Sequence, residues 1–585
     1  MLAAADTYVV VVVLPTVMSG VGIGLEHLQR ATPIISGFLL GYVAILPLLG
    51  RLSDLLGREP VFAGCLLAFA FGSVLTATAH GLGVLVVGRA LQGLGGGGLI
   101  PVALSLVAAQ WPPQARGLPL GIVGAVQELG SVLGPLYGAA VVAVAGWRTI
   151  FWLNLPLAAV LGTAFFLSRP VAAEHAEPRQ PPARSGGFDF VGAALLGLGL
   201  AVLATALDAP AQLTDSVTLG GWLTPGAGGA SWGPFTSRLA LAGAGVLAAF
   251  VAWELLCPHA YRPLVAFRRL PDLLVEADVA GAALLAGFLA CVVVLFSTAD
   301  PGHQLVASSA PVVAPVGLGC LGAFAWRQGK ARQPLLQPRS LAARPAWGAL
   351  VVNLALGGAL MAALIDVPFF ARATIDPHSQ VDAALVLLRF LVAVPLGAVL
   401  GGLLTRRSGR GPAVATMGML LSAAMFVAMT SWSARALSVD WTVLGVTWPF
   451  RQSDVELVAC GLGFGLVISP LNAAVLDHVE ARLHGLATSL TVVARTVGML
   501  AGLSALTAIG LRRFYEAQAR IGSPFTLCPA SPGSCPAYDR ATNRALLAEL
   551  HTIFAGAAVC ALIAAVLAGL LLRSRGRLTP ATVED

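Results

Sequence analysis

The sequence predicts an all-α membrane protein with many spanning helices. Of its 585 residues, 57% are hydrophobic and 11% are charged, whereas soluble globular proteins carry roughly 25% charged residues. The mean hydropathy is +0.84, so much of the chain must be stable in contact with lipid. Apolar runs long enough to cross a bilayer as helices recur along the whole chain. These observations exclude an ordinary soluble enzyme.

About sixteen apolar runs are predicted to be transmembrane helices. Six form a first group, at 1–24, 31–50, 60–79, 83–108, 118–143 and 149–168. Two helix pairs follow, at 190–208 with 238–257 and at 274–298 with 309–327. Six more runs lie at 348–370, 381–404, 412–431, 453–476, 486–512 and 549–572.

This pattern divides the chain into four regions. We predict an N-terminal six-helix bundle (1–168), a linker region with helix pairs at 190–257 and 274–327 (169–347), a C-terminal six-helix bundle (348–573) and a tail (574–585). Within the linker region, 171–188 is rich in Pro, Glu and Arg and is expected to be a solvated segment.

The basic residues predict the orientation in the membrane. They gather in alternate loops, for example at Arg406, Arg407 and Arg410, as the positive-inside rule requires of cytoplasmic loops. We therefore expect a multi-pass protein of the cytoplasmic (inner) membrane with both termini and the tail in the cytoplasm. The net charge of +7 is dispersed through these loops, which disfavours nucleic-acid binding.

The two bundles share a sequence repeat, and the second bundle carries a long extension. Gly50 to Arg58 recurs as Gly402 to Arg410, each after the second helix of its bundle, with Asp54 replaced by Arg406. A helical pattern continues over 485–520, which at 1.5 Å per residue is on the order of 50 Å, and it resumes near Tyr538. We expect an external helical extension at 513–548.

Two cysteines share the polar loop of this extension. Cys528 and Cys535 face the oxidising side in the predicted topology, so a disulfide is one interpretation and two free thiols are the alternative. The other cysteines lie in or near apolar runs. Neither these nor the histidines have a spacing typical of a metal site, so we expect no metal.

Charged residues inside predicted helices are candidates for function, because burying one without a partner costs several kcal/mol. Four stand out: Asp6, Glu128, Arg89 and Arg495. We expect Asp6, Glu128 and Arg495 to face a common cavity, where protonation of a carboxylate frees Arg495 to pair again and so changes the stable conformation. The alternative is a structural ion network. Asp366 and Arg389 lie nearer helix ends and are expected at the interface.

Four motifs, in order, resemble the major facilitator superfamily and its fourteen-helix drug:proton antiporter branch. They are the loop motif (Gly50, Asp54, Gly57, Arg58), the fourth-helix motif (Arg89, Gln92, Gly93), the antiporter motif (Gly130, Gly134, Pro135, Gly138) and a sixth-helix motif from Gly146 to Pro156. The resemblance implies two six-helix bundles around a central cavity, here with about four extra linker helices. The glycine run from Gly93 to Gly98 lacks the Lys-Ser/Thr of a phosphate loop, so it indicates helix packing.

The segments around Asp6, Glu128 and Arg495 are most similar to the mycobacterial triacylglyceride exporters that work with a periplasmic lipoprotein. The resemblance assigns the central charged transport residues to these three positions. It also implies a lipid cargo, contacts with membrane lipids and a lipoprotein partner. Members of this group have a longer apolar lead before the first-helix aspartate, so we expect an in-frame apolar stretch upstream of Met1.

The expected function is proton-coupled lipid export by alternating access, driven by a proton gradient without a bound cofactor, by a monomer. A multidrug:proton antiporter and a non-transporting membrane scaffold are the alternatives. No arrangement of nucleophile, base and oxyanion donors can be found in the sequence, so we do not expect an enzyme.

Overall fold

A computed structural model describes most of the chain. The described residues are 2–21, 28–167, 187–208, 237–256, 261–262, 275–297, 309–331, 334–335, 342–374, 380–408, 410–437, 442–443, 446–447, 451–528 and 535–573. Most of the predicted solvated segment and the predicted tail lie outside these residues.

The first bundle contains seven α-helices for its six predicted spans. They are α1 (Leu2–Gly20), α2 (Leu28–Ala44), α3 (Leu46–Leu56), α4 (Arg58–Ala77), α5 (Leu82–Gln110), α6 (Gly117–Ala145) and α7 (Trp147–Leu167), with a 3₁₀ turn η2 (Pro113–Ala115) before α6. The predicted span 31–50 is divided at Ile45 because Pro47, in the first turn of α3, has no N–H to continue the ladder of α2. Gly57 links α3 to α4 at φ +91°, which favours glycine.

Two helix hairpins follow, as predicted. The first is α8 (Phe190–Asp208) with α11 (Arg238–Leu256), and it lies at the edge of the first bundle. Two short strands, β1 (Gly187–Phe188) and β2 (Tyr261–Arg262), pair in parallel at its base. The second hairpin is α13 (Val279–Ser297) with α14 (Ala310–Lys330), and α13 packs against α2, α3 and a helix of the second bundle, α19.

The second bundle is formed by six long helices. They are α15 (Arg344–Thr374), α16 (Gln380–Ser408), α17 (Gly411–Met429), α18 (Gln452–Leu476), α19 (His484–Gln518) and α21 (Pro536–Leu571). Shorter elements lie between them: β3 (Thr442–Val443) and β4 (Val446–Thr447), which pair antiparallel, the 3₁₀ turn η7 (Ala481–Leu483) and α20 (Pro524–Leu527). The fold is all-α apart from these short strand pairs.

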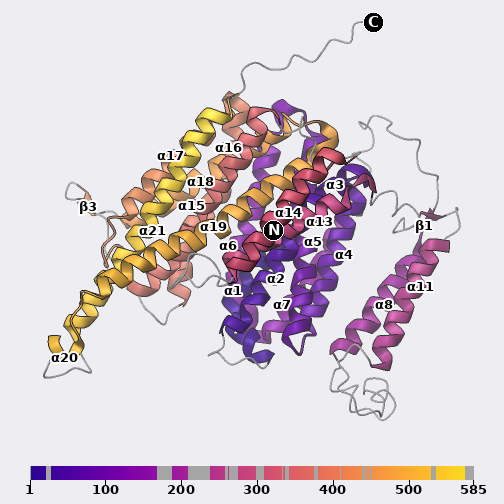
Figure 1. Ribbon diagram of the computed structural model, residues 1–585, viewed down its shortest axis with the longest axis horizontal. Coiled ribbons are helices and arrows are strands. Elements are labelled where there is room, and N and C mark those ends of the chain that lie inside the picture. The colour runs from indigo at the N-terminus through magenta and orange to yellow at the C-terminus, as the bar shows by residue number, and fades with distance from the viewer. Residues whose placement is uncertain are drawn as a thin grey trace, which may run out of the picture.

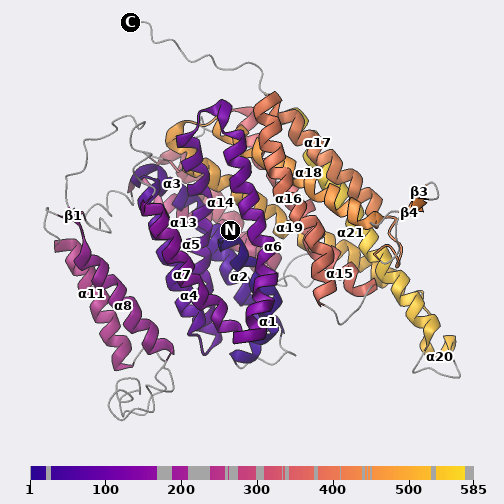
Figure 2. The same cartoon turned by 180° about the vertical axis from the view of Figure 1, so that it is seen from behind.

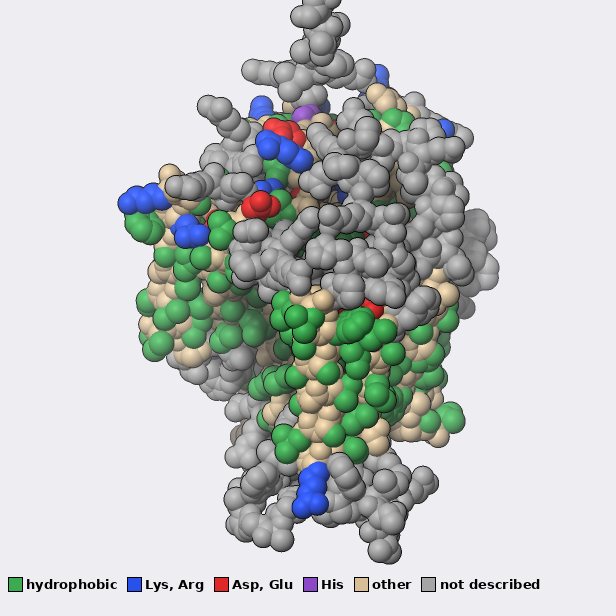
Figure 3. Space-filling view, turned by 90° about the vertical axis from the view of Figure 1, so that its right-hand side faces the viewer, with side chains coloured by type: hydrophobic (Ala, Val, Ile, Leu, Met, Phe, Trp, Pro, Cys, Tyr) green, Lys and Arg blue, Asp and Glu red, His purple; other side chains and the backbone are tan. Residues whose placement is uncertain are grey.

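Every predicted span corresponds to a helix of the structure. In the described part of the chain, thirteen helices are long and apolar enough to cross a membrane, with α2 and α3 counted together. The exact number of sixteen spans, like the domain boundaries at 168, 347 and 573, stays a prediction. Figure 3 shows a broad band of hydrophobic side chains with charged side chains gathered mainly above it, as expected of a multi-pass membrane protein.

The two bundles meet at one end through matching glycine contacts. A Cβ on Gly50 of α3 would lie 2.5 Å from the carbonyl oxygen of Gly485 on α19, and one on Gly402 of α16 would lie 2.4 Å from that of Gly117 on α6. Gly50 and Gly402 are equivalent in the sequence repeat, so the repeat has a structural counterpart. We call this end, formed by 50–58, 116–124, 398–408 and 477–489, the closed end.

The bundles diverge away from the closed end, and α19 and α21 run beyond the other helices (Figures 1 and 2). Both helices continue as the extended pattern predicts, and α20 lies at the tip between them. Cys528 and Cys535 are joined by a disulfide next to this tip. We call the described residues of this extension, 513–528 and 535–548, the arm.

Candidate functional site

Glu128 and Arg495 form an ion pair between the two bundles. Nη1 of Arg495 on α19 donates to Oε1 of Glu128 on α6 at 2.9 Å, and the side chains are 15% and 11% exposed, respectively. Glu128 is eleven residues after the first residue of α6, and Arg495 is eleven after that of α19. At 1.5 Å per residue each lies about 16 Å from the closed end, close to the middle of a hydrocarbon core of ~30 Å.

Asp6 is held in a separate network inside the first bundle. Nη1 of Arg89 on α5 donates to Oδ2 of Asp6 on α1, and Nδ2 of Asn154 on α7 donates to Oδ1 of Asp6 at 3.0 Å. Gln92 accepts from Arg89 at 3.0 Å and donates to Ser73 of α4 at 2.8 Å. All five residues are buried. The network therefore joins four helices of one bundle.

The structure thus divides the predicted charged residues into two pairs, and this corrects the expectation of a single group around Arg495. Close contacts show where α1 lies along α6: Gly134 lies against Ala5, next to Asp6, and Gly138 lies against Val9. Glu128 is six residues nearer the closed end than Gly134, a rise of about 9 Å. Each carboxylate consequently has its own arginine at its own depth.

The motif glycines serve close helix packing. Gly134 and Gly138 of the antiporter motif bring α6 against α1. Gly93 lies against the backbone of Phe38 on α2, and a Cβ there would be 2.0 Å from that carbonyl oxygen. The glycine run is part of α5, which agrees with the packing interpretation. Pro135 lies in α6, and Gly130 is buried there.

Asp54 connects the bundles at the closed end. Its carboxylate accepts hydrogen bonds from the backbone N–H groups of Gly485 at 2.8 Å and Leu486 at 3.0 Å. These are unpaired donors of the first turn of α19, where the helix dipole favours a negative charge. Arg58 and Arg51 lie within electrostatic range of the same carboxylate. The loop motif therefore fastens the first bundle to the start of α19.

Sequence reasoning missed a second ionic contact at the closed end. Arg116 before α6 pairs with Asp477 after α18 at 3.3 Å. Burial raises the pKa of the Asp477 carboxyl, and the nearby Arg116 guanidinium opposes that shift. The two residues are 361 positions apart in sequence, so no local pattern could have paired them.

Asp366 and Arg389 both have charged neighbours on other helices of the second bundle. Asp366 on α15 is only 6% exposed, within electrostatic range of Glu549 on α21. Arg389 on α16 pairs with Asp454 in the first turn of α18 at 2.9 Å. Asp366 is buried between helices, whereas the Arg389 side chain is 31% exposed, and the expected position near the membrane interface stays a prediction for both. In the described part of the chain, no group of three or more His, Cys, Asp or Glu residues could hold a metal ion.

This fold and these cross-bundle contacts define a membrane transporter of two helical bundles. The sequence model of the Major Facilitator Superfamily matches residues 1–503. The chain therefore belongs to this superfamily, and it is a multi-pass membrane protein.

Within this superfamily, the chain is similar to proteins named as triacylglyceride transporters. The chain is 34% identical over 586 residues to a triacylglyceride transporter of Mycolicibacterium smegmatis, covering 98% of this chain and 86% of the relative. It is also 34% identical to a triacylglyceride transporter of Mycobacterium tuberculosis, covering 98% of this chain and 93% of that one. A crystal structure of a human organic anion transporter has the same fold, with a TM-score of 0.52, 15% identity and coverage of 97% and 96%.

Proposed function

We propose that the protein is a proton-coupled exporter of triacylglyceride-like lipids that works by alternating access. The observation that carries the coupling is the Glu128–Arg495 pair, because it is buried at mid-depth and joins elements that must separate during transport. Protonation of Glu128 would neutralise the carboxylate and remove most of its attraction for Arg495. The relative stability of the two bundle arrangements would then change with the proton bound.

The described conformation corresponds to an outward-facing state in this proposal. The closed end holds the basic loop residue Arg58 and the repeat residue Arg406, so the positive-inside rule places it in the cytoplasm. The end of α21 would then be cytoplasmic and the membrane would be the cytoplasmic one. Asp54 and the Arg116–Asp477 pair keep the cytoplasmic side shut in this state, and they must be released for the inward-facing state.

Two observations favour a lipid cargo over a water-soluble one. Relatives at 34% identity over 98% of the chain are named triacylglyceride transporters. The arm continues the helices of the second bundle outward, so it offers a path from the bundle to an acceptor beyond the membrane. We further propose a periplasmic lipoprotein as the acceptor, a monomeric exporter and no enzymatic step.

Reconstituted vesicles separate this function from multidrug efflux. Fluorescent triacylglyceride and ethidium are followed in parallel, with an imposed pH gradient and after an ionophore has collapsed it. We expect gradient-dependent movement of the lipid. Movement of ethidium alone, persisting after 513–545 is shortened, would contradict the lipid assignment and favour the drug antiporter. No gradient-dependent movement of either probe would favour the non-transporting scaffold.

A further inference from the structure

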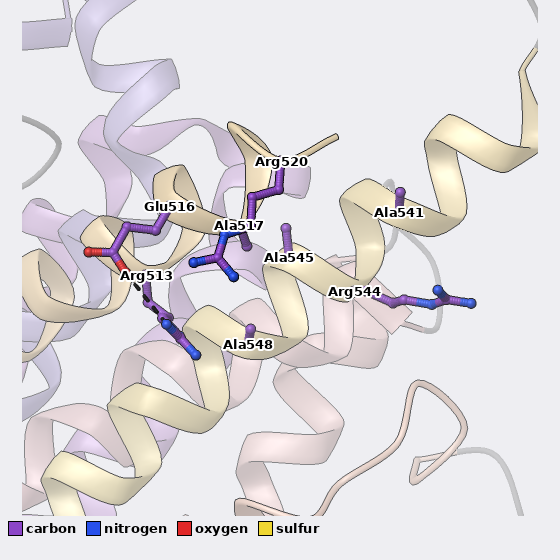
Figure 4. Close-up of a pocket in the computed structure, with 8 residues that line it drawn as sticks. All are labelled: Arg513, Glu516, Ala517, Arg520, Ala541, Arg544, Ala545 and Ala548. Atoms are coloured by element: carbon purple, nitrogen blue, oxygen red, sulfur yellow. Dashed lines mark hydrogen bonds and ion pairs between the residues drawn. The ribbon is translucent and has the colours of Figure 1, made fainter. Parts of the chain in front are cut away.

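The arm contains a basic groove between its two helices. A pocket of about 250 Å³ opens between α19 and α21, and Figure 4 shows the residues that line it. Arg513, Glu516 and Ala517 on α19 follow helical spacing, and Arg520 lies two residues after the end of that helix; they face Ala541, Arg544, Ala545 and Ala548 on α21. The long side chains of Arg513 and Arg520 therefore stand opposite the alanines of α21, which also contributes Arg544.

The groove begins where apolar packing between the two helices ends. Nearer the bundle, Gly510 of α19 lies against Ile553 of α21, and Gly556 lies against Leu506. Beyond Gly510 the facing positions change from these packed residues to arginine and alanine. An alanine cannot fill the space opposite an arginine, so the two helices leave a hollow that a ligand can occupy.

The charge of the groove is not balanced within it. Glu516 pairs with Arg513 at 3.5 Å and with Arg512, outside the groove, at 3.2 Å. In the described part of the chain, Arg520 and Arg544 have no ion pair. The guanidinium groups of Arg513 and Arg520 both reach toward the alanine face of α21, whereas Arg544 extends away from them (Figure 4).

We propose that this groove binds a phosphate group, and that in the membrane the phosphate belongs to the head group of an anionic phospholipid. Guanidinium groups match phosphate oxygens with paired, charge-assisted hydrogen bonds. The arm tip favours a lipid source over an acidic protein, since Phe525 and Leu527 are 73% and 43% exposed there. Exposed aromatic and apolar side chains beside arginines are typical of segments that lie in a membrane interface.

The inference deepens the proposed lipid export and rests on it for the source of the phosphate. A head group held in the groove would keep the arm against a lipid surface while a neutral lipid passes. The groove recognises a phosphate, and a triacylglyceride has none. The cargo and the phospholipid bound in the groove are therefore different molecules.

Native mass spectrometry of the full-length protein in detergent tests the proposal. The protein is titrated with phosphatidylglycerol, with phosphatidylcholine, and with phosphatidylglycerol in the presence of inorganic phosphate. We expect tighter binding of phosphatidylglycerol and a loss of at least about tenfold in Arg520→Glu. Arg520→Lys should lose less, because it keeps the charge without the paired geometry.

The matched control is Arg540→Glu. Arg540 lies on the same arm and outside the groove, with its Nε donating to the Pro536 carbonyl, so the change in net charge is equal. Ala545→Leu fills the groove without changing charge and should also weaken binding. If Arg540→Glu weakens binding as much as Arg520→Glu, or if neither does, the groove site is wrong.

The competitor identifies the source of the phosphate. Competition by inorganic phosphate with no preference for phosphatidylglycerol supports a phosphate site whose ligand is the free anion. If phosphatidylglycerol binds more tightly than phosphatidylcholine and inorganic phosphate does not remove that preference, the bound phosphate is that of the lipid head group. Equal binding of both lipids, unaffected by phosphate, overturns the proposal. Triacylglyceride transport by the wild type is measured separately, so failure of the groove is distinguishable from failure of the exporter function.

Discussion

Glu128 and Arg495 lie at the same depth on opposite bundles, each eleven residues from the closed-end start of its helix, and their charged groups meet at 2.9 Å. The contact lies about 16 Å inside the closed end, well away from Asp54. A protonation event at Glu128 can therefore act on the bundle interface without directly touching the loop motif that fastens the closed end.

Arg495→Gln should impair folding as well as transport. The substitution removes the Arg495 guanidinium from a Glu128 carboxylate that is only 11% exposed, and removing one member of a buried pair costs about 3–5 kcal/mol. The neutral double variant Glu128→Gln with Arg495→Gln should recover most of the thermal stability in detergent but not transport. Recovered transport in the double variant would show that the pair is only structural.

Asp6→Asn should act chiefly on stability. Arg89 is 1% exposed, so loss of its partner charge leaves a buried cation and costs about 3–5 kcal/mol. Combining Asp6→Asn with Arg89→Gln should restore part of the unfolding temperature, as measured by a thermal shift in detergent. If Asp6→Asn alone has normal stability but does not transport lipid, Asp6 has a direct role in coupling instead.

Asp54→Asn should shift the protein toward a conformation in which the closed end is open. The change removes the charge that accepts two backbone hydrogen bonds at the start of α19, a loss of about 2 kcal/mol, or roughly 30-fold in population. Spin labels on the exposed positions Gln114 and Glu480 report the opening as a longer distance component. An unchanged distance distribution would contradict this role.

Gly402→Val should block closure of the same end. A Cβ at Gly402 would lie 2.4 Å from the carbonyl oxygen of Gly117, so the backbones of α16 and α6 must separate to admit it. We expect correctly folded protein without vesicle transport. The control is Gly64→Val on α4, because a Cβ there has nothing within 4 Å. Equal transport by both variants would mean that the helices need not approach so closely.

The sequence was sufficient for the parts of the fold that depend on local pattern. Hydropathy located the long helices, the repeat identified Gly50 and Gly402 as equivalent positions, and the continuous pattern over 485–520 predicted the extension of α19. Charge inside apolar runs identified the ionisable residues Glu128 and Arg495, which the structure brings together.

Local sequence patterns could not predict which distant charged residues form pairs. Asp6 and Arg89 are 83 positions apart and Arg116 and Asp477 are 361 apart, and only the packing of helices decides which charges meet. Likewise, no local pattern indicated that α21 would cover Asp366 and bring Glu549 within its electrostatic range. Helix position alone does not report the burial that neighbouring helices impose.

The proposed coupling is tested most directly by transport of fluorescent triacylglyceride in vesicles with an imposed pH gradient, comparing wild type with Glu128→Gln. Gln keeps the shape of the side chain but cannot bind or release the proton. We predict that the wild type moves lipid only with the gradient and that the variant, compared at an equal amount of folded protein in the vesicles, shows no gradient-driven movement. Gradient-driven lipid movement at the wild-type rate by Glu128→Gln would contradict the assignment of proton coupling to this carboxylate.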